Sequence, residues 1–353
     1  MRRLVISGIA LLATAACLTL APLWFASAHA ADGDAKGAAA AAPMTFDLTA
    51  ASSDAAAGFL ALSGTQTTMA INGQPGSRTR WVLAYGTDVL ASGAVALDDR
   101  GRGSVVLDLP SVRTRTLCTV TVSTEKTRAR RELTVLPQNM LEDARAELER
   151  LRVGVIDPSG NIVAALKAEG VASESLDTDL QRDFFMGGMV ILAGFADCAT
   201  LSEECRRLRS RVDDGMIALV VAPPAGWREF DMSCVAMPMP GSGPLLLAGN
   251  AGRCLSTEDV GDGPWPAYLE CGRDARPLVR FQFVPDSTPP LLSCPESRAV
   301  LAGAACGKGV AVAAALPQLN DPAHDPVGRC ALNEMITWSL AERRALELKE
   351  DKP

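Results

Sequence analysis

The residues with the clearest chemical potential follow a short apolar run, RVGVID, and precede a predicted helix. They are Asp157, Ser159 and Asn161, separated by Pro158 and Gly160. A helix N-terminus presents free N–H groups, so this loop is a candidate site for a carboxylate, a phosphate or a sugar hydroxyl. The alternative is a turn in which Ser159 or Asn161 caps the helix, and capping alone accounts for these residue types. We therefore favour the cap.

A second candidate ligand-binding site combines aromatic residues in the Gly- and Pro-rich stretch after residue 223. Trp265 and Tyr268 stand in the sequence GPWPAY, and Trp227 precedes them. If the rings are exposed, they form a platform that could stack on a sugar ring. Buried aromatic side chains more often pin a long loop to the core, and this is the simpler interpretation.

Nucleophilic catalysis is disfavoured by what is missing around the reactive side chains. Cys234 stands in MSCV, without the glycines of a strained strand-to-helix turn, and a thiol without a neighbouring base is a poor nucleophile. His324 lies with Asp321 and Asp325 in a Pro-rich segment, where a turn is a simpler interpretation than a general base. Acidic pairs such as Asp213–Asp214 accompany arginines on a charged helix face, and do not single out the two opposed carboxylates of a glycosidase. We assign no catalytic residues.

The cysteines and histidines argue against a metal site or a cofactor. Nine cysteines remain after residue 30, no CxxC motif occurs, and His324 is the one histidine of that part of the chain. Zinc sites use clustered Cys and His, so we expect no metal and no cofactor. Cys118 alternates with valines and is expected to be a buried hydrophobe. The other eight suit an oxidising compartment, with Cys254–Cys271 and Cys294–Cys306 as candidate disulfides.

The elements that must position these residues form two predicted domains, of which the first spans residues 44–136. It consists of short β-type runs separated by turn residues such as Asn72-Gly73 and Asp98–Gly101. Many short strands without intervening helices predict an all-β sandwich of the immunoglobulin-like (Ig-like) kind. The runs are TFDLTA, FLALS, TTMAI, RWVLAYG, VLASGAVAL, GSVVLDL, LCTVTVS and ELTVL.

The second predicted domain, residues 152–345, alternates buried strands with helices. This pattern predicts an α/β flavodoxin-like open parallel sheet covered on both faces. Residues 137–151 predict a connecting helix, capped by Asn139, whose apolar stripe docks on one of the domains. The stretch 223–292 is irregular, with FQFV as its clearest strand, and 346–353 is a charged tail that is expected to fray. Strands are expected at 153–156, 189–193, 216–222 and 309–315, and helices at 162–169, 202–213 and 326–345.

Several segments of this second domain resemble the class I glutamine amidotransferase-like fold. They are RVGVID, GGMVILAG, RVDDGMIALVVAP and the closing GKGVAVAAALPQLNDPAHDPVGRCALNEMITWSL. The resemblance is closer to the non-catalytic version that forms the trimerisation domain of family 42 β-galactosidases. Catalytic members carry G-x-C-x-G and a later H-x-E, and this chain has neither, since Pro223, Pro224 and Ala225 follow the third strand. The resemblance therefore implies a degenerate domain used for binding or assembly.

The N-terminal segment predicts export. Arg2 and Arg3 precede an uncharged apolar run that ends at Ala28-His29-Ala30, the pattern of a signal peptide over residues 1–30. The alternative is an uncleaved membrane anchor, because the run is long enough to span a bilayer. Residues 31–43 are predicted to be a low-complexity linker.

The charge of the chain excludes some classes of partner. The formal charge is −7 and becomes −9 when the two arginines of residues 1–30 are removed. An acidic chain is poorly suited to bind nucleic acid or an anionic membrane surface. The Arg-rich stretch Lys126–Arg131 is expected to be a solvated loop.

Together these observations favour an exported, non-catalytic binding or assembly protein associated with carbohydrate processing at the cell envelope, in a periplasmic, cell-surface or secreted location. Expected partners are a carbohydrate, another protein, or further copies of the chain. The alternative is an exported carbohydrate-active hydrolase with an unrecognised carboxylate pair in the loops between Trp227 and Pro290. A third hypothesis is an adhesion module, in which residues 44–136 contact the partner.

Overall fold

The computed structural model of the chain describes residues 44–48, 52–54, 58–241, 245–247, 265–281 and 298–350. The predicted signal peptide and the linker at 31–43 lie outside these ranges. The chain divides into a unit of residues 1–41 and a unit of residues 42–353, and the described residues belong to the second. Within the described ranges, no helix is both long enough and apolar enough to cross a bilayer.

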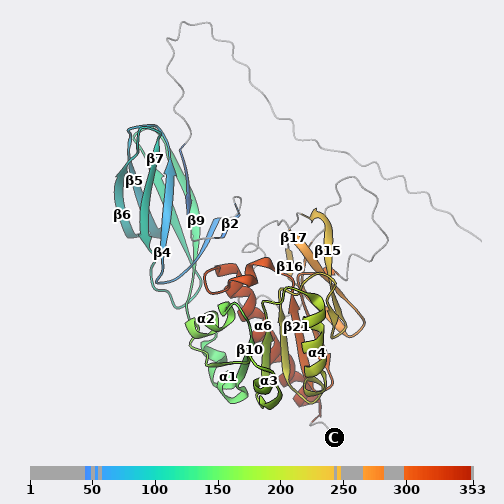
Figure 1. The fold of residues 1–353 in the computed structure, drawn as a ribbon. Helices are drawn as coiled ribbons and strands as arrows, with labels where there is room; N and C mark the ends of the chain where they lie inside the picture. Colours follow the sequence, from blue (N-terminus) through green and yellow to red (C-terminus); the bar gives the residue numbers. More distant parts are fainter. Residues whose placement is uncertain are drawn as a thin grey trace, which may run out of the picture. The chain divides into compact units, whose positions relative to one another are not determined.

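Residues 44–136 fold into a β-sandwich, as predicted (Figure 1). Sheet A has the strand order β1-β4-β7 and sheet B the order β2-β3-β9-β8-β5-β6. Phe46, Met69 and Leu107 of sheet A share one buried core with Leu83 and Val120 of sheet B. The period-two alternation of each run therefore sets which side chains are buried. The strands are β1 (Thr45–Leu48), β2 (Ser52–Asp54), β3 (Gly58–Leu62), β4 (Gln66–Asn72), β5 (Arg78–Tyr85), β6 (Asp88–Ala96), β7 (Arg102–Asp108), β8 (Thr116–Ser123) and β9 (Arg128–Leu136).

The segment after the sandwich is helical, but the helix begins later than predicted. A 3-10 turn, η1 (Glu142–Ala144), leads into α1 (Arg145–Leu151). The predicted Asn139 cap is wrong, because Leu141 stands at the N-cap position and no side chain caps the turn. The predicted apolar stripe is buried, with Leu141 and Leu148 in the same core as strands of the second domain.

The second domain is built on an eight-stranded sheet in the order β11-β10-β12-β13-β21-β20-β18-β16. The first five strands are parallel, and in chain order they are arranged 2-1-3-4-5, the order of flavodoxin-like sheets. The remaining three are antiparallel, so the prediction of a wholly parallel sheet is wrong at that edge. The strands are β10 (Val153–Ile156), β11 (Ser173–Ser175), β12 (Met189–Leu192), β13 (Ile217–Val221), β16 (Leu245–Leu247), β18 (Ala275–Phe281), β20 (Leu301–Cys306) and β21 (Gly309–Ala314).

Helices cover both faces of this sheet. α2 (Asn161–Ala168) and α6 (Pro326–Glu350) contribute to one core with α1, whereas α4 (Cys198–Asp213) contributes to the other. Every residue of β10, β12, β13 and β21 is buried, which explains the near-continuous apolar runs. α6 continues to Glu350, so the predicted fraying from Leu346 is wrong for residues 346–350.

The stretch 223–292 contains β-strands where the sequence predicted irregular chain. Sheet D has the order β14-β15-β17-β19, with β14 (Arg228–Glu229), β15 (Met232–Gly241), β17 (Trp265–Cys271) and β19 (Arg298–Ala299). Phe230 and Asp231, between β14 and β15, both have positive φ, as a type I′ hairpin turn requires. Of the predicted strand FQFV, Phe281 ends β18 and residues 282–284 lie outside the described residues.

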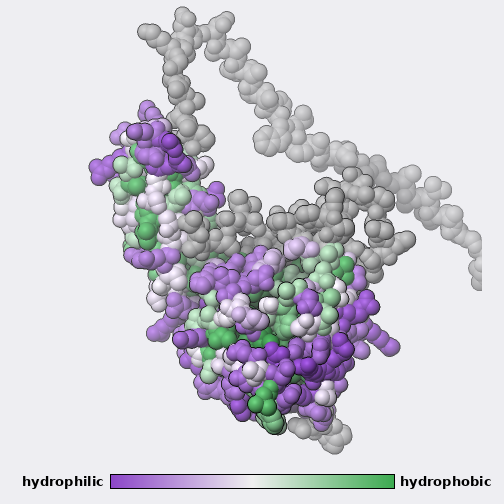
Figure 2. Space-filling model, viewed as in Figure 1, coloured by the Kyte–Doolittle hydropathy of each residue, from purple (hydrophilic) through white to green (hydrophobic). Residues whose placement is uncertain are grey.

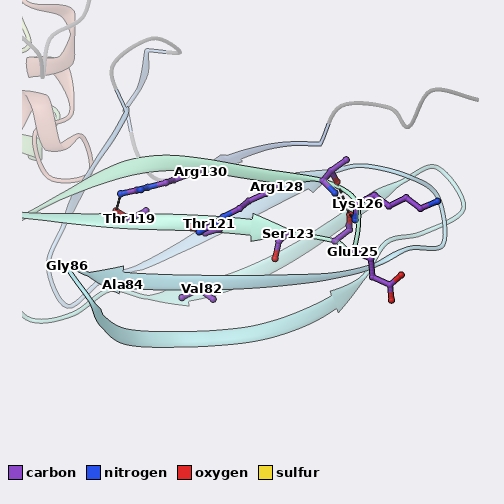
Figure 3. A pocket seen from close by; sticks show the side chains of 12 residues that line it. Val82, Ala84, Gly86, Thr119, Thr121, Ser123, Glu125, Lys126, Arg128 and Arg130 are labelled. Atoms are coloured by element: carbon purple, nitrogen blue, oxygen red, sulfur yellow. Dashed lines mark hydrogen bonds between the residues drawn. The ribbon is translucent and has the colours of Figure 1, made fainter.

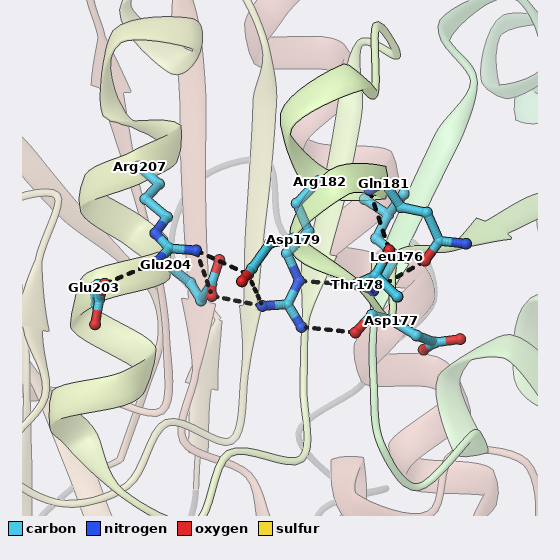
Figure 4. Close-up of polar contacts among 9 residues, drawn as sticks. All are labelled: Leu176, Asp177, Thr178, Asp179, Gln181, Arg182, Glu203, Glu204 and Arg207. Carbon is cyan, nitrogen blue, oxygen red and sulfur yellow. Dashed lines mark hydrogen bonds and ion pairs between the residues drawn. The ribbon is translucent and has the colours of Figure 1, made fainter.

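α3 (Asp179–Phe184), which the sequence did not predict, is held by polar contacts (Figure 4). Arg182 donates to the buried Glu204 of α4 at 2.7 Å, and Arg207 of α4 donates to Asp179 at 3.1 Å. The polar face of this segment contacts α4, and its apolar side chains face solvent. Figure 2 shows hydrophobic surface over α3. These apolar side chains are Leu180, Phe184 and Met186, which are 68%, 74% and 82% exposed.

Candidate functional site

The loop after β10 is a helix cap formed by the carboxylate of Asp157. One oxygen accepts from the backbone N–H of Ile162 at 2.7 Å, and the other accepts from the N–H and the hydroxyl of Ser159 at 3.0 and 2.6 Å. Asn161 donates to the carbonyl of Asn320 at 2.8 Å. An incoming anion would therefore meet a negative charge at the start of α2. Capping was the favoured interpretation, and it holds for Ser159, whose hydroxyl accepts from the N–H of Asn161 at 3.3 Å, while the N–H of Ile162 is accepted by Asp157, which was not predicted as a cap.

Two of the three aromatic residues of the candidate platform are buried. Trp227 is fully buried in the core beside α4, and Tyr268 is 6% exposed in the core on the other face of the sheet. Neither ring offers a free face to a sugar, so for these two residues the platform alternative is wrong and the favoured interpretation, packing against the core, is confirmed. Trp265 begins β17, and its side chain lies outside the described part of the molecule.

The carboxyl end of β13 has a left-handed backbone without a nucleophile. Ala222 has a φ of 46°, a conformation that L-residues other than glycine adopt at an energetic cost, and donates its N–H to Ala314 at 2.8 Å. Cys234 donates its thiol to the carbonyl of Pro223 at 3.2 Å. Burial raises the pKa of Cys234 to about 11, so this thiol stays protonated at neutral pH. The nearest thiol to the strand end is therefore a packing group.

His324 belongs to a turn, as the sequence predicted. Its side chain is 82% exposed, and Nδ1 lies 2.9 Å from a carboxylate oxygen of Asp321. Asp325 accepts from the backbone N–H groups of Val327 and Gly328 at the start of α6. In the described ranges, no group of three or more His, Cys, Asp or Glu residues could hold a metal ion.

The cysteines of the described chain are free thiols. Cys271 and Cys306 are among them, so neither forms the candidate disulfide with Cys254 or with Cys294, two residues that lie outside the described ranges. Burial raises the pKa of the Cys271 and Cys306 thiols to about 11. Cys118 is fully buried, as predicted from its alternation with valines. The free thiols are Cys118, Cys198, Cys205, Cys234, Cys271, Cys306 and Cys330.

A groove of about 600 Å³ lies on the outer face of sheet B (Figure 3), and we call it the β8 groove. Its floor is a row of hydroxyls on β8, those of Thr119, Thr121 and Ser123, beside Val82 and Ala84 of β5. These β8 residues alternate with the buried Cys118, Val120 and Val122, so the strand period turns every hydroxyl to the same outer face. The row spans about 14 Å, from four residue steps of about 3.4 Å.

Two arginines of β9 extend over this row of hydroxyls (Figure 3). Arg130 pairs with Thr121 in the strand register and donates to Thr119 at 3.3 Å, and Arg128 pairs with Ser123. The next residue inward, Arg131, instead packs over the rings of Phe46 and Phe59 in the sandwich core. Alternation along β9 therefore separates the two groove arginines from a third that stabilises the core.

The turn between β8 and β9 closes one end of the groove. The N–H of Thr124 donates to the carbonyl of Thr127 at 2.9 Å, and the two threonine hydroxyls lie 2.8 Å apart. The turn also carries Glu125 and Lys126. Such side-chain bonds fix the hairpin register, and with it the position of the arginines over β8.

The β8 groove is positive in an acidic chain. Its lining carries Lys126, Arg128 and Arg130 against the single carboxylate of Glu125. Within the described ranges, Arg128 and Arg130 form no ion pair with a carboxylate, so their charge is available to a ligand. Arginine presents a planar fork that matches a carboxylate, sulfate or phosphate, and hydroxyls both donate and accept. The groove can therefore bind an anionic ligand that is rich in hydroxyls.

The sequence contained part of the signal for this groove. The stretch Lys126–Arg131 was predicted to be a solvated loop, but residues 128–131 belong to β9. The alternation of Arg128 and Arg130 with Ala129 is a strand pattern, and TLCTVTVS shows the matching alternation of hydroxyls. What the sequence could not provide is the pairing that places the arginines above the hydroxyls.

No protein-family model matches the chain, and no curated protein matches it significantly. Solved structures with some similarity include an engineered protein, with 16% identity, 27% of this chain and 21% of that chain covered, and a TM-score of 0.20. The CARDB domain of a Pyrococcus furiosus protein, solved with di-metal ions, is 7% identical; the match covers 27% of this chain and 93% of that domain, with a TM-score of 0.20. The IG27 protein domain has 15% identity, 22% and 86% coverage and a TM-score of 0.18. At such scores these similarities carry no argument about function.

Proposed function

We propose that this chain is an exported, non-catalytic binding protein whose sandwich holds an anionic, hydroxyl-rich ligand in the β8 groove. The observation that carries the proposal is that Arg128 and Arg130 lie over a row of hydroxyls without a carboxylate partner in the described chain. An arginine without a carboxylate partner keeps its charge and its donors for a ligand. These two are directed at a polar floor.

The chemistry of the groove favours an acidic polysaccharide. The guanidinium groups match the carboxylates or sulfates of such a polymer, and the hydroxyls of Thr119, Thr121 and Ser123 match its hydroxyl groups. The row is about 14 Å long, which suits an extended ligand rather than a single small anion. Export, predicted from residues 1–30, would place the protein where such polymers occur.

Two features support a binding role rather than catalysis. The groove lining contains one carboxylate, Glu125, whereas glycoside hydrolysis ordinarily needs two. At the end of β13, Ala222 has the left-handed backbone of a strained turn but offers only a methyl group. Together with the 2-1-3-4-5 strand order, this supports a degenerate amidotransferase-like domain that serves assembly.

Isothermal titration of the full mature chain with polygalacturonate, and with neutral dextran as the comparison, tests this function. We expect polygalacturonate to bind and dextran not to bind. Arg128→Gln/Arg130→Gln should weaken binding about tenfold to 100-fold, since two charge-assisted contacts of about 1 kcal/mol or more are lost. Thr121→Val should weaken binding about two- to tenfold through one hydroxyl.

The matched control is Arg100→Gln/Arg113→Gln, which removes the same charge from exposed positions outside the groove lining. It should bind as the unaltered protein does. Equal weakening by both double variants would mean that net charge, and not the groove, attracts the polymer. Hydrolysis of the polymer that is lost on substitution of a single carboxylate would overturn the non-catalytic assignment.

A further inference from the structure

The β6 strand forms an open edge of the sandwich. It is the last strand of sheet B, and its one ladder within the described chain is with β5 (Figure 1). Its outward-facing N–H and C=O groups are therefore free to pair with another strand. All nine of its side chains are exposed or partly exposed.

Between Ala91 and Ala96, this edge lacks the features that normally prevent strand pairing. Natural edge strands carry lysine, proline or inward charges, or are very short. β6 has nine residues, and after its first residue, Asp88, no charge or proline occurs up to Leu97. By contrast, the edge strand β7 begins with Arg102 and ends with Asp108, and β11 has three residues including Glu174.

A bulge confines the regular part of the edge to residues 91–96. The register with β5 shifts between Leu83 and Ala84, so Leu90 has no direct partner on β5. Beyond it the pairing is regular from Ala91 to Ala96. A second strand therefore has six residues with which to form a ladder.

The side chains of this regular segment leave room for a neighbour. Gly93 lies under the indole of Trp81, since a Cβ there would be 2.9 Å from the ring. Ala91 and Val95 pack against the sandwich core, whereas Ser92 and Ala94 share the outer face with Val82 and Arg80. None of these side chains is long enough to obstruct an approaching backbone.

We propose that five residues of the 91–96 segment pair with the same residues of a second copy of this chain, antiparallel about a two-fold axis that passes beside Gly93 or Ala94. In an antiparallel pair of strands related by a two-fold axis, each residue lies opposite a residue that is an even number of positions away in the sequence. Core-facing residues therefore meet core-facing residues, and the outer-face residues meet one another. An uncharged edge favours a second copy, because no like charges then face each other across the axis and no charge selects a foreign strand.

Analytical ultracentrifugation of the full mature chain over a range of concentrations tests the dimer. We expect a monomer–dimer equilibrium in the unaltered protein. Ala94→Lys places like charges close together across the axis and should raise the dimer dissociation constant about fivefold, since a like-charge cross-strand pair costs up to about 1 kcal/mol. Ser104→Lys is the matched control, because it adds the same charge to an exposed site on β7, in sheet A, and should leave the dimer intact.

Hydrogen exchange on the unaltered protein provides a second measurement that does not depend on a variant folding. The outward-facing amides of residues 91–96 should become protected as the protein concentration rises, while those of β7 should not change. A chain that stays monomeric at every concentration would overturn the proposal. So would a dimer that withstands Ala94→Lys, or one that is disrupted by Ser104→Lys.

Discussion

Replacing Glu169 with alanine should destabilise the second domain more than any surface substitution. This glutamate has no exposed surface and lies where three parts of the domain meet. One carboxylate oxygen accepts from Arg329 and Asn333 of α6 at 3.3 and 3.1 Å, and the other accepts from the N–H of Leu141 at 3.3 Å. The carboxylate therefore joins α6 and the segment before α1 to the end of α2.

The size of the effect follows from the burial of both charges. Arg329 is 3% exposed, and its remaining donors bond to the carbonyls of Pro322 and Ala323, which carry no full charge. Removing one partner of a buried ion pair costs about 3–5 kcal/mol, because the other charge stays buried. At about 2–4 °C per kcal/mol for a domain of this size, the melting temperature should fall by about 6–20 °C.

Urea and thermal unfolding followed by circular dichroism measure this change. Glu174→Ala is the matched control, since Glu174 pairs with Arg152 at an exposed site and should cost less than about 1 kcal/mol. Glu169→Gln, which keeps one carbonyl acceptor but loses the charge, should fall between the two. If Glu169→Ala were no more harmful than Glu174→Ala, the buried pair would not stabilise the domain and our reasoning would be refuted.

Three further predictions concern other parts of the chain. Iodoacetamide at pH 8 should leave Cys205 and Cys234 unmodified until the protein unfolds, because burial raises their pKa values to about 12 and about 11. Peptide mass spectrometry of the folded protein checks this, and a label on either cysteine would contradict it. Burial raises the pKa of Asp325, so the folded state keeps this proton to higher pH than the unfolded state does. The stability of the protein relative to Asp325→Asn should therefore fall as pH rises from below about 3.9 through the raised pKa. Urea titrations in which this stability difference instead grows with pH would refute the prediction. Leu180→Ser with Phe184→Ser should change the unfolding free energy by less than about 1 kcal/mol, because both side chains face solvent, and a larger loss in urea would show that they are packed.

Much of the fold could be predicted because its strands are marked locally. The sandwich runs alternate buried and exposed residues, and each of the eight predicted runs overlaps a strand of the structure, although β2 was not predicted. Buried strands such as Met189–Leu192 are continuous apolar runs, which are typical of a parallel sheet with both faces covered. The flanking helices were predicted to within a few residues, since Gly170 and Gly215 mark where α2 and α4 end.

The remainder depends on contacts between distant parts of the chain. β15 contains Pro238 and Pro240 and has no regular alternation, so its pairing with β17 was not visible in the sequence. Trp227 and Tyr268 were candidates for a platform, with packing as the favoured interpretation, and they are buried in the cores on opposite faces of the large sheet. Burial of an aromatic ring is decided by what packs on it, which one segment cannot reveal.

The sequence by itself determined which side of each strand faces outward, and that β13 ends without a nucleophile. Side-chain period is a local property, so the outward row of Thr119, Thr121 and Ser123 was already present in the order of the residues. The tertiary structure decided that Arg128 and Arg130 lie over this row and that β6 is left at the edge. Register and strand order arise from backbone pairing across the sheets, and they bring together residues whose own sequence neighbours carry no sign of the encounter.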